Sequence, residues 1–314
     1  RYRREHGRTG HLIVSSVEHS AVLAVAEHLQ HTQGWQVSVL PVTSEGVVSP
    51  DTLAQAIRPN TALVSIMHGN NEIGTLQPIE ALGQICRSKG VYFHTDAVQT
   101  LGKLPLDLSC LPVDYVTGSA HKIYGPKGIG LLWVHPEAVT PDPLFFGGSQ
   151  QGGLRPGTEN VAAVIGFCQA FELCCQRMRL ETPRLHTLQD RLMSAIEALF
   201  PNQVVINGPL SPQSRVPGNV HLSIVTDSSN PLGKRPQTPS NIGESLVLKL
   251  DLKGFALASG SACHSGALTP SHVVLALGKS EALARATLRI SMGQSTSEDD
   301  VDRLISALAE VLAS

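Results

Sequence analysis

Ser119-Ala120-His121-Lys122-Ile123-Tyr124-Gly125-Pro126-Lys127-Gly128 follows the apolar, β-branched run Val113–Gly118. A lysine therefore comes directly after an expected buried strand and beside a Gly-Pro turn. An earlier apolar run, Val91–His94, ends in Thr95-Asp96. Because parallel α/β sheets bind ligands at the carboxyl ends of their strands, we expect Lys122 and Asp96 at one edge of such a sheet.

Short apolar runs alternate with helical repeats along the first half of the chain. The expected strands are Leu12–Ser15, Val37–Val42, Ala62–Met67, Val91–His94, Val113–Gly118 and Ile129–Val134. The expected helices are Ser20–His31, a segment that opens at Ser49-Pro50, and Pro78–Lys89. This alternation predicts a large domain over residues 1–177, with a mainly parallel sheet covered by helices.

The second half of the chain predicts a smaller α/β domain over residues 178–314. Two long helices are expected over Val161–Arg179 and Pro183–Phe200. The elements expected after them are a strand at Val220–Val225, a helix at Gly243–Leu252, a strand at Phe255–Ser259, a helix from Thr269-Pro270, a strand at Leu288–Ser291 and a last helix capped by Ser297. The segment Asp227–Asn241 is rich in Ser, Pro and Asn, which is typical of an exposed loop.

The composition excludes several classes of protein. Of 314 residues, 42% are hydrophobic and 16% charged, so intrinsic disorder is not expected. A net charge of -2 offers no basic surface for nucleic acid, and no basic amphipathic helix or sufficiently long apolar run indicates a membrane. Six cysteines without a CxxC motif indicate a reducing, cytoplasmic compartment and mostly buried, inert thiols.

The chain starts at Arg1, without a methionine or the apolar stretch of a signal peptide. We therefore expect a processed or incomplete chain.

A lysine and an aspartate at one sheet edge suit pyridoxal 5'-phosphate (PLP). The lysine would form a Schiff base with the cofactor aldehyde, and the aspartate would keep the pyridine nitrogen protonated. The alternative is an ordinary buried ion pair between Asp96 and Lys122, which costs less than an unpaired buried carboxylate. The spacing alone leaves both interpretations open.

Two further segments carry reactive or charged side chains. Phe255–Gly266 reads FALASGSACHSG, in which small residues surround Cys263 and His264 follows it. Cys263 is either an accessible nucleophile on a mobile loop or a packed free thiol. Arg289 lies within an apolar strand, where it either binds a substrate carboxylate or forms a structural salt bridge.

These segments together resemble the NifS/IscS-like cysteine desulfurases, which are PLP enzymes of fold type I and belong to the class V aminotransferase group. They occur in the family's order and spacing. The matching stretches are Val17–His19, Met67–Gly74, His94–Gln99, Ser119–Gly128, Arg155–Asn160, Ser259–Cys263 and Leu288-Arg289.

The resemblance implies a role for each matching site residue. Lys122 binds PLP covalently and moves a proton, while His19 stacks on the ring and helps to shuttle protons. By the same resemblance, Asp96 pairs with the pyridine nitrogen, Gln99 bonds to the phenolic oxygen, and Ser119 and His121 bind the phosphate. Thr158 binds the phosphate of the neighbouring subunit, so the resemblance also implies a homodimer. Asn71 and Arg289 hold the substrate carboxylate, and Cys263 takes the substrate sulfur.

The implied reaction converts L-cysteine to L-alanine and leaves the sulfur as a persulfide on the enzyme. The sulfur then passes to an acceptor or iron–sulfur scaffold protein, for cluster assembly or thiolation. Alternatives are a selenocysteine lyase-like PLP enzyme and an inactive chain that serves as a binding module.

The sequence departs from the family in several places. The family's N-terminal segment, with a phosphate-binding loop, is expected to be missing. Ala120 replaces a usual glycine, and Gly147–Gln151 differs slightly from the family pattern.

Overall fold

The computed structural model describes residues 7, 9–225, 242–260 and 269–313. Contacts divide the chain into two compact units. Unit 1 comprises Arg1–Leu40, Val48–Gly69 and Gln77–Met178, and unit 2 comprises Pro41–Val47, Asn70–Leu76 and Arg179–Ser314. The two short segments of unit 2 that interrupt unit 1 have no counterpart in the sequence-based division at residue 177.

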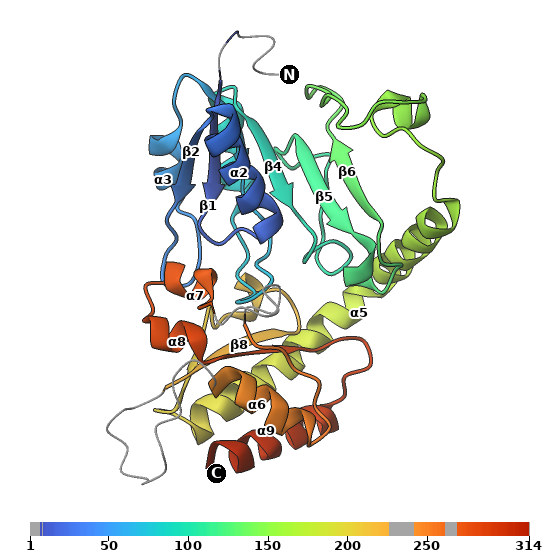
Figure 1. Ribbon diagram of the computed structural model, residues 1–314. Helices are drawn as coiled ribbons and strands as arrows, with labels where there is room; N and C mark the ends of the chain where they lie inside the picture. Colours follow the sequence, from blue (N-terminus) through green and yellow to red (C-terminus); the bar gives the residue numbers. More distant parts are fainter. Residues whose placement is uncertain (1–6, 8, 226–241, 261–268, 314) are drawn as a thin grey trace. The chain divides into compact units, whose positions relative to one another are not determined.

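Unit 1 is built on a six-stranded sheet with the strand order β2-β1-β3-β4-β5-β6 (Figure 1). The strands are β1 His11–Ser15, β2 Gln36–Leu40, β3 Thr61–Ser65, β4 Tyr92–Asp96, β5 Tyr115–Ser119 and β6 Gly130–Val134. The first five strands run parallel, and β6 pairs antiparallel with β5. The expected mainly parallel sheet is confirmed.

Three helices connect the strands of unit 1: α2 Ser20–Gln33, α3 Pro50–Ala56 and α4 Ile79–Ser88. Helix α2 begins at the cap residue His19 and ends at Gly34, which has a φ of 68°. A left-handed residue ends a helix readily when it is glycine, because no Cβ opposes that conformation. Helix α3 starts with a proline, as the Ser49-Pro50 pair predicts.

The two long helices expected around residue 180 form one helix, α5 Val161–Leu199, with Pro183 inside it. Proline removes one backbone hydrogen bond. Leu188 and Leu192, which follow Pro183, pack into the core of unit 2, and this packing keeps the helix continuous. By length and composition alone, α5 could cross a membrane. A single such helix is weak evidence for a membrane protein, since part of it forms a core.

Unit 2 contains an antiparallel sheet with the order β7-β8-β9. Its strands are β7 Val204–Ile206, β8 Asn219–Ile224 and β9 Thr287–Ser291, and its further helices are α6 Ile242–Asp251, α7 His272–Ala276, α8 Glu281–Arg285 and α9 Glu298–Ala313. Leucine, isoleucine and valine side chains from α5, α6, α9 and the sheet form its core. The predicted second α/β fold is confirmed.

Several details of unit 2 differ from expectation. The strand predicted at Phe255–Ser259 is reduced to one bridge, between Ala258 and Arg289. The helix expected from Thr269-Pro270 begins at His272, because the Ser271 side chain caps it by accepting a hydrogen bond from the Val274 amide. Strand β7 was not predicted, since three residues carry too little pattern. The predicted loop at 227–241 lies outside the described residues.

Candidate active site

Polar side chains gather where the parallel strands of unit 1 end. His19 follows β1, Asp96 ends β4, and Ser119 ends β5. The carboxyl ends of parallel strands share one edge of a sheet, so these residues lie along the edge where α/β proteins bind ligands. The predicted edge location of Asp96 and Lys122 is confirmed by this topology.

Lys122 lies on a single turn of 3-10 helix, Ala120–Ile123, that follows β5 directly. The turn ends at Tyr124, whose φ of 67° is uncommon for a residue other than glycine. Ala120, in place of the family's glycine, is fully buried in a cluster with Ile123 and Phe167 of α5. Burial of its neighbours fixes the lysine turn, while the Lys122 side chain is exposed.

Gly166 of α5 brings that helix close to the same turn. A Cβ at Gly166 would lie 2.6 Å from Cγ of Pro126, which explains a helical glycine at this point. The Cys174 thiol lies 3.6 Å from the carbonyl oxygen of Ile123 and donates to it. Helix α5 thus supports the lysine turn from behind.

Asp96 is a partly buried carboxyl. Oδ1 accepts a hydrogen bond from the Val98 amide at 2.9 Å. Burial raises the pKa of Asp96, and the Val98 hydrogen bond and the nearby His19 oppose this rise. Among the described residues Asp96 makes no ion pair with Lys122, so the structural ion pair considered from the sequence is not formed.

His19 is held by its own helix. Its Nδ1 accepts a hydrogen bond from the Ala21 amide at 3.2 Å, which caps α2 and fixes the ring at the end of β1. The charge interaction between His19 and Asp96 is part of the balance that sets the Asp96 pKa. The structure therefore brings these two predicted residues together.

The other predicted cofactor residues of unit 1 are also polar and accessible. Ser119 Oγ lies 2.7 Å from His121 Nδ1, and burial, followed by the charges of Lys122 and Lys127, lowers the pKa of His121. Gln99 is half-buried at the turn after β4. Thr158 is exposed in the segment before α5.

These residues fit PLP. A desolvated carboxyl whose pKa is raised gains from a cationic donor such as a protonated pyridine nitrogen. Lys122 has an exposed amine without an ion-pair partner among the described residues. No group of three metal-ligating side chains occurs in the described ranges.

Unit 2 carries the two residues predicted to hold a carboxylate. Nη1 of Arg289, in β9, donates to the backbone oxygen of Asn71 at 3.1 Å. Arg289 forms no ion pair with any described residue, so the structural salt bridge considered from the sequence is not formed there. Its positive charge is half-buried and available for an anion.

The segment 70–76, which carries Asn71, is held by hydrogen bonds on both sides of that residue. The Asn70 side-chain oxygen accepts hydrogen bonds from the amides of Glu72 and Ile73 at 2.8 and 2.9 Å. The Ser271 hydroxyl, at the start of α7, donates to Oε2 of Glu72 at 2.6 Å. These buried contacts give Asn71 a defined position within unit 2.

Cys263 lies outside the described residues, so its role stays a prediction. The chain is described up to Gly260, whose amide donates to Thr287 Oγ1 at 3.0 Å. Ala258 exchanges backbone hydrogen bonds with Arg289 at 2.7 and 3.3 Å. The segment that leads into the predicted cysteine loop is thus paired with β9.

The expectation that the remaining cysteines are buried is wrong for most of them. Of the five cysteines that the structure describes, only Cys86 is buried, and its burial raises the pKa of the thiol to about 12. Cys110, Cys168 and Cys175 are exposed, and Cys174 is half-buried. The reason is that Cys168 and Cys175 lie on α5 away from its packed side, a distinction that hydrophobic surroundings in the sequence do not reveal.

Sequence reasoning assigned no role to one buried polar group beside each predicted set. In unit 1, Glu18 is completely buried next to His19, and burial with the charge of Lys122 lowers the pKa of Lys103 to about 8. In unit 2, Arg215 is completely buried and donates to backbone oxygens. The position of Glu18, three residues after the end of β1, was the feature of the sequence that could have indicated its role. Arg215 lies in a loop, where no sequence pattern indicates that it is buried.

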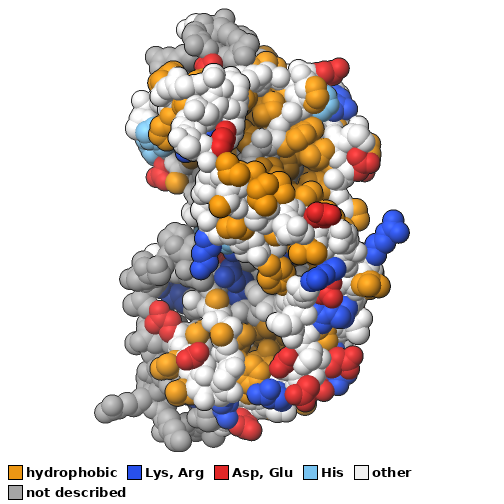
Figure 2. Space-filling view, turned by 90° about the vertical axis from the view of Figure 1, so that its right-hand side faces the viewer, with side chains coloured by type: hydrophobic (Ala, Val, Ile, Leu, Met, Phe, Trp, Pro, Cys, Tyr) orange, Lys and Arg blue, Asp and Glu red, His pale blue; other side chains and the backbone are white. Residues whose placement is uncertain are grey.

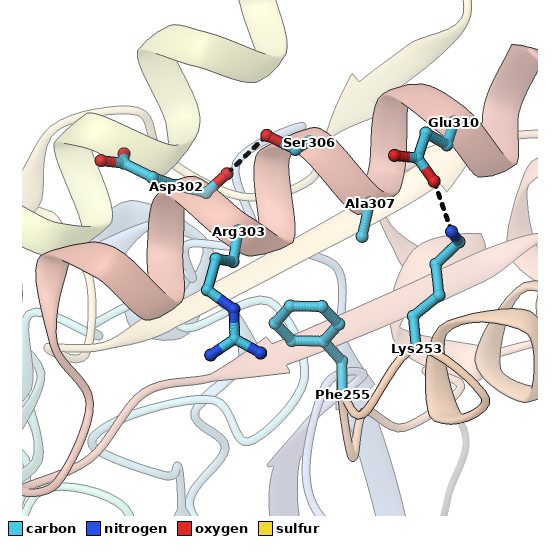
Figure 3. Close-up of a pocket in the computed structure, with 7 residues that line it drawn as sticks. All are labelled: Lys253, Phe255, Asp302, Arg303, Ser306, Ala307 and Glu310. Atoms are coloured by element: carbon cyan, nitrogen blue, oxygen red, sulfur yellow. Dashed lines mark hydrogen bonds and ion pairs between the residues drawn. The ribbon is translucent and has the colours of Figure 1, made fainter.

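A hollow of about 410 Å³ in unit 2 is distinct from these residues (Figure 3). It is lined by Lys253, Phe255, Asp302, Arg303, Ser306, Ala307 and Glu310. Lys253 pairs with Glu310, and the Arg303 guanidinium lies 5.7 Å from the centre of the Phe255 ring. Asp302 and Arg303 pair with Arg191 and Asp300 outside the lining. No described residue of the predicted site lines the hollow.

The sequence matches the family described as Aminotransferase class-V over residues 1–304. The chain belongs to the aminotransferase class V family. It is 39% identical over 302 residues to "Cysteine desulfurase IscS" of Clostridium botulinum, covering 96% of this chain and 72% of that protein. It is 42% identical over 305 residues to "Cysteine desulfurase, mitochondrial" of Arthroderma benhamiae, covering 97% and 56%.

A solved structure named "NIFS-LIKE PROTEIN" aligns with a TM-score of 0.84 and 31% identity, over 99% of this chain and 78% of that one. The resemblance of this class V chain to NifS/IscS-like cysteine desulfurases is confirmed, and so is the predicted fold class. The roles of the individual site residues and the cytoplasmic location stay predictions.

Proposed function

We propose that this chain is a cysteine desulfurase that uses PLP to convert L-cysteine to L-alanine and takes the sulfur onto Cys263. The observation that carries the proposal is the set His19, Asp96 and Lys122 at the carboxyl edge of the unit 1 sheet, in a class V chain whose relatives are named cysteine desulfurases. When bound, PLP supplies a ring that stabilises negative charge on the substrate carbon beside the amino group.

Unit 1 residues hold and tune the cofactor in this proposal. Asp96 accepts a hydrogen bond from the pyridine nitrogen and keeps it protonated, and Gln99 donates to the phenolic oxygen. The Lys122 amine attaches the cofactor and moves the proton of the substrate carbon. His19, which is fixed as the cap of α2, would stack on the ring of the bound cofactor and assist that proton transfer.

Ser119 and His121 bind the phosphate, and Thr158 reaches the phosphate of the partner subunit in a homodimer. An exposed apolar surface on unit 1 supports the homodimer, since large exposed apolar patches are typical of protein interfaces. Figure 2 shows hydrophobic side chains on the side of the molecule that carries β6. Large apolar side chains of unit 1 that are exposed in β6, in the segment after it and at the start of α5 are Leu131, Leu132, Leu144, Phe145, Phe146, Val161 and Ile165.

Residues of unit 2 act on the substrate. Asn71 and Arg289 bind the carboxylate of L-cysteine. The Cys263 thiolate attacks the substrate sulfur, the sulfur–carbon bond breaks, and its electron pair stays with the carbon, which takes up a proton and leaves as L-alanine. The persulfide on Cys263 is then available to a sulfur acceptor or an iron–sulfur scaffold protein.

The test compares four variants of the purified protein incubated with PLP and labelled cysteine. Lys122→Ala should lose borohydride-trapped cofactor and alanine release, and Lys127→Ala, in the same exposed turn, is its matched control. Cys263→Ser should keep bound PLP but lose both the persulfide and the alanine, with the exposed thiol variant Cys110→Ser as control.

Two outcomes would overturn the assignments. If Lys122→Ala still traps PLP on the protein, Lys122 is not the attachment site. If Cys263→Ser still forms alanine from cysteine, Cys263 is not the nucleophile, and a lyase of the selenocysteine type becomes the better description. A chain that binds no PLP would instead be an inactive binding module.

A further inference from the structure

Glu18 is a completely buried carboxyl at the edge where the cofactor residues gather. The Ser15 hydroxyl, at the end of β1, donates to Oε1 of Glu18 at 2.6 Å. The Met67 amide, beyond β3, donates to the same oxygen at 2.9 Å. One oxygen of Glu18 therefore joins the carboxyl ends of two neighbouring strands.

The contacts of Glu18 connect it to Asp96 and His19, the two residues assigned to the cofactor ring. Met67 precedes His68, whose amide donates to the backbone oxygen of Asp96 at 2.9 Å. His68 is fixed in turn by Thr100, whose hydroxyl lies 2.8 Å from Nδ1. On the other side, Glu18 directly precedes His19, the cap of α2. A displacement of the Glu18 side chain would therefore shift the positions of both Asp96 and His19.

The charge state of Glu18 follows from its surroundings. Burial raises the pKa of its carboxyl to about 8, the hydrogen bonds from Ser15 and Met67 oppose the rise, and the nearby Asp96 adds to it. Both hydrogen bonds converge on Oε1, which can accept two donors in either charge state, so the complete burial of the side chain is what favours the neutral acid. Burial also lowers the pKa of His68 to about 4, so that imidazole is neutral at pH 7.

Other titratable groups near these strand ends are His94 and His19, together with His121 and Lys122 in the turn after β5. Burial lowers the pKa of His94, in β4, to about 4, and its ring is held by Ser65 at 2.7 Å. His19 interacts with Asp96 through its charge. With Glu18, His68 and His94 neutral, Asp96 is the carboxyl of this group that is left to pair with a cation.

We propose that Glu18 is a positioning residue that works as a neutral acid, tying β1 to β3 so that Asp96 alone presents a negative charge to the pyridine nitrogen. The inference rests on the PLP site of the proposed function. A neutral acid at this place has a physical advantage. A second carboxylate beside Asp96 would raise the pKa of Asp96 further and weaken its hold on a protonated pyridine nitrogen.

Glu18→Gln separates this role from that of an ionised carboxylate. Glutamine keeps an oxygen that can accept from Ser15 and Met67 and has no charge, whereas Glu18→Ala removes the acceptor. At pH 7 we expect Glu18→Gln to bind PLP within about twofold of the unaltered chain, and Glu18→Ala to bind roughly tenfold or more weakly because two buried donors lose their acceptor. Glu27→Gln, at an exposed glutamate of α2, is the matched control.

A second measurement does not depend on the cofactor. A carboxyl whose pKa is 4.5 when unfolded and about 8 when folded stabilises the fold below pH 4.5, and this stabilisation is lost as the pH rises to 8. The urea midpoint of the apoprotein, followed by the fluorescence of Trp35 and Trp133 in unit 1, should therefore shift in favour of Glu18→Gln as the pH rises from 5 to 8. Glu27→Gln should run parallel to the unaltered chain.

The proposal is overturned if Glu18→Gln loses as much PLP affinity as Glu18→Ala, or if its urea midpoint keeps a constant difference from that of the unaltered chain between pH 5 and 8. Either result would mean that the folded protein holds Glu18 as a carboxylate. If the unaltered chain binds no PLP, the proposed function fails, and the apoprotein comparison still decides the charge state of Glu18.

Discussion

Replacing Arg215 tests how unit 2 keeps a charge inside its structure. The guanidinium is completely buried, and no described acidic side chain forms an ion pair with it. It donates instead to three backbone oxygens, those of Asn207 at 2.6 Å, Pro209 at 2.8 Å and Asn219 at 3.4 Å. Burial lowers its pKa only to about 10, so the group is charged at neutral pH.

The expected loss of stability follows from the two short hydrogen bonds. A hydrogen bond that involves a charged group contributes about 1.5–3 kcal/mol, so removing two of them in Arg215→Ala should destabilise unit 2 by about 3–6 kcal/mol. Arg215→Met should lose less, because methionine fills much of the space and removes the burial of a charge. The segment 70–76 should loosen as well, since Val216 donates to the backbone oxygen of Gly74 at 2.7 Å.

Amide hydrogen exchange followed by mass spectrometry is the suitable assay. Both tryptophans lie in unit 1, so fluorescence reports that unit and serves as an internal control, whereas peptides from β7 and β8 report unit 2. Arg191→Ala, which removes an exposed arginine paired with Asp302, should leave exchange unchanged. If Arg215→Ala exchanges like Arg191→Ala, the three backbone oxygens do not stabilise the buried charge as argued.

Three further predictions concern unit 1. Asp96→Ala should weaken PLP binding roughly tenfold in equilibrium dialysis, because the pyridine nitrogen loses its charged acceptor, and unchanged affinity would contradict the assignment. Gly83→Ala should lower the free energy of unfolding by about 1–3 kcal/mol, since the new Cβ would lie 2.2 Å from the backbone oxygen of Pro112; an unaltered urea midpoint would refute this. Burial of part of their rings lowers the pKa values of the half-buried His68 and His94 to about 4, so both bind protons between pH 6.5 and 4 only in the unfolded state. The free energy of unfolding should therefore fall on acidification by up to ~1.4 kcal/mol per pH unit for each, and a flat fluorescence-monitored profile would contradict this.

The elements with strong local patterns were the ones that sequence reasoning placed well. The strand at His11–Ser15 and the last helix, which starts after Ser297, follow from a β-branched run and from a serine cap before acidic residues. Pro183 misled the prediction, because a proline argues locally for a break while the packing on both sides of it argues for continuity. The bridge at Ala258 depends on pairing with β9, which no local pattern records.

The same distinction applies to the candidate site. Asp96 and Lys122 were identified because each comes directly after an apolar run, and strand direction then places them on one edge. Glu18 and Arg215 could not be assigned, since their burial depends on segments distant in sequence, such as Met67 for the first and Asn207 for the second. A charged residue in a polar loop is ordinarily exposed, so only the three-dimensional contacts reveal the exceptions.

Strand β6 closes the order of the large sheet, with β5 as its neighbour among the described strands. An outermost strand offers open N–H and C=O groups to any extended chain that approaches it. The side chains of Leu131 and Leu132 are 37% and 52% exposed, so this edge strand also presents apolar surface to solvent. In newly synthesised chains, aggregation through this strand therefore competes with correct assembly. A Leu132→Lys substitution should reduce the aggregation, because a charged side chain disfavours pairing of the strand with another chain. Substitutions in β6 should therefore change the protein yield at high expression more than they change catalysis.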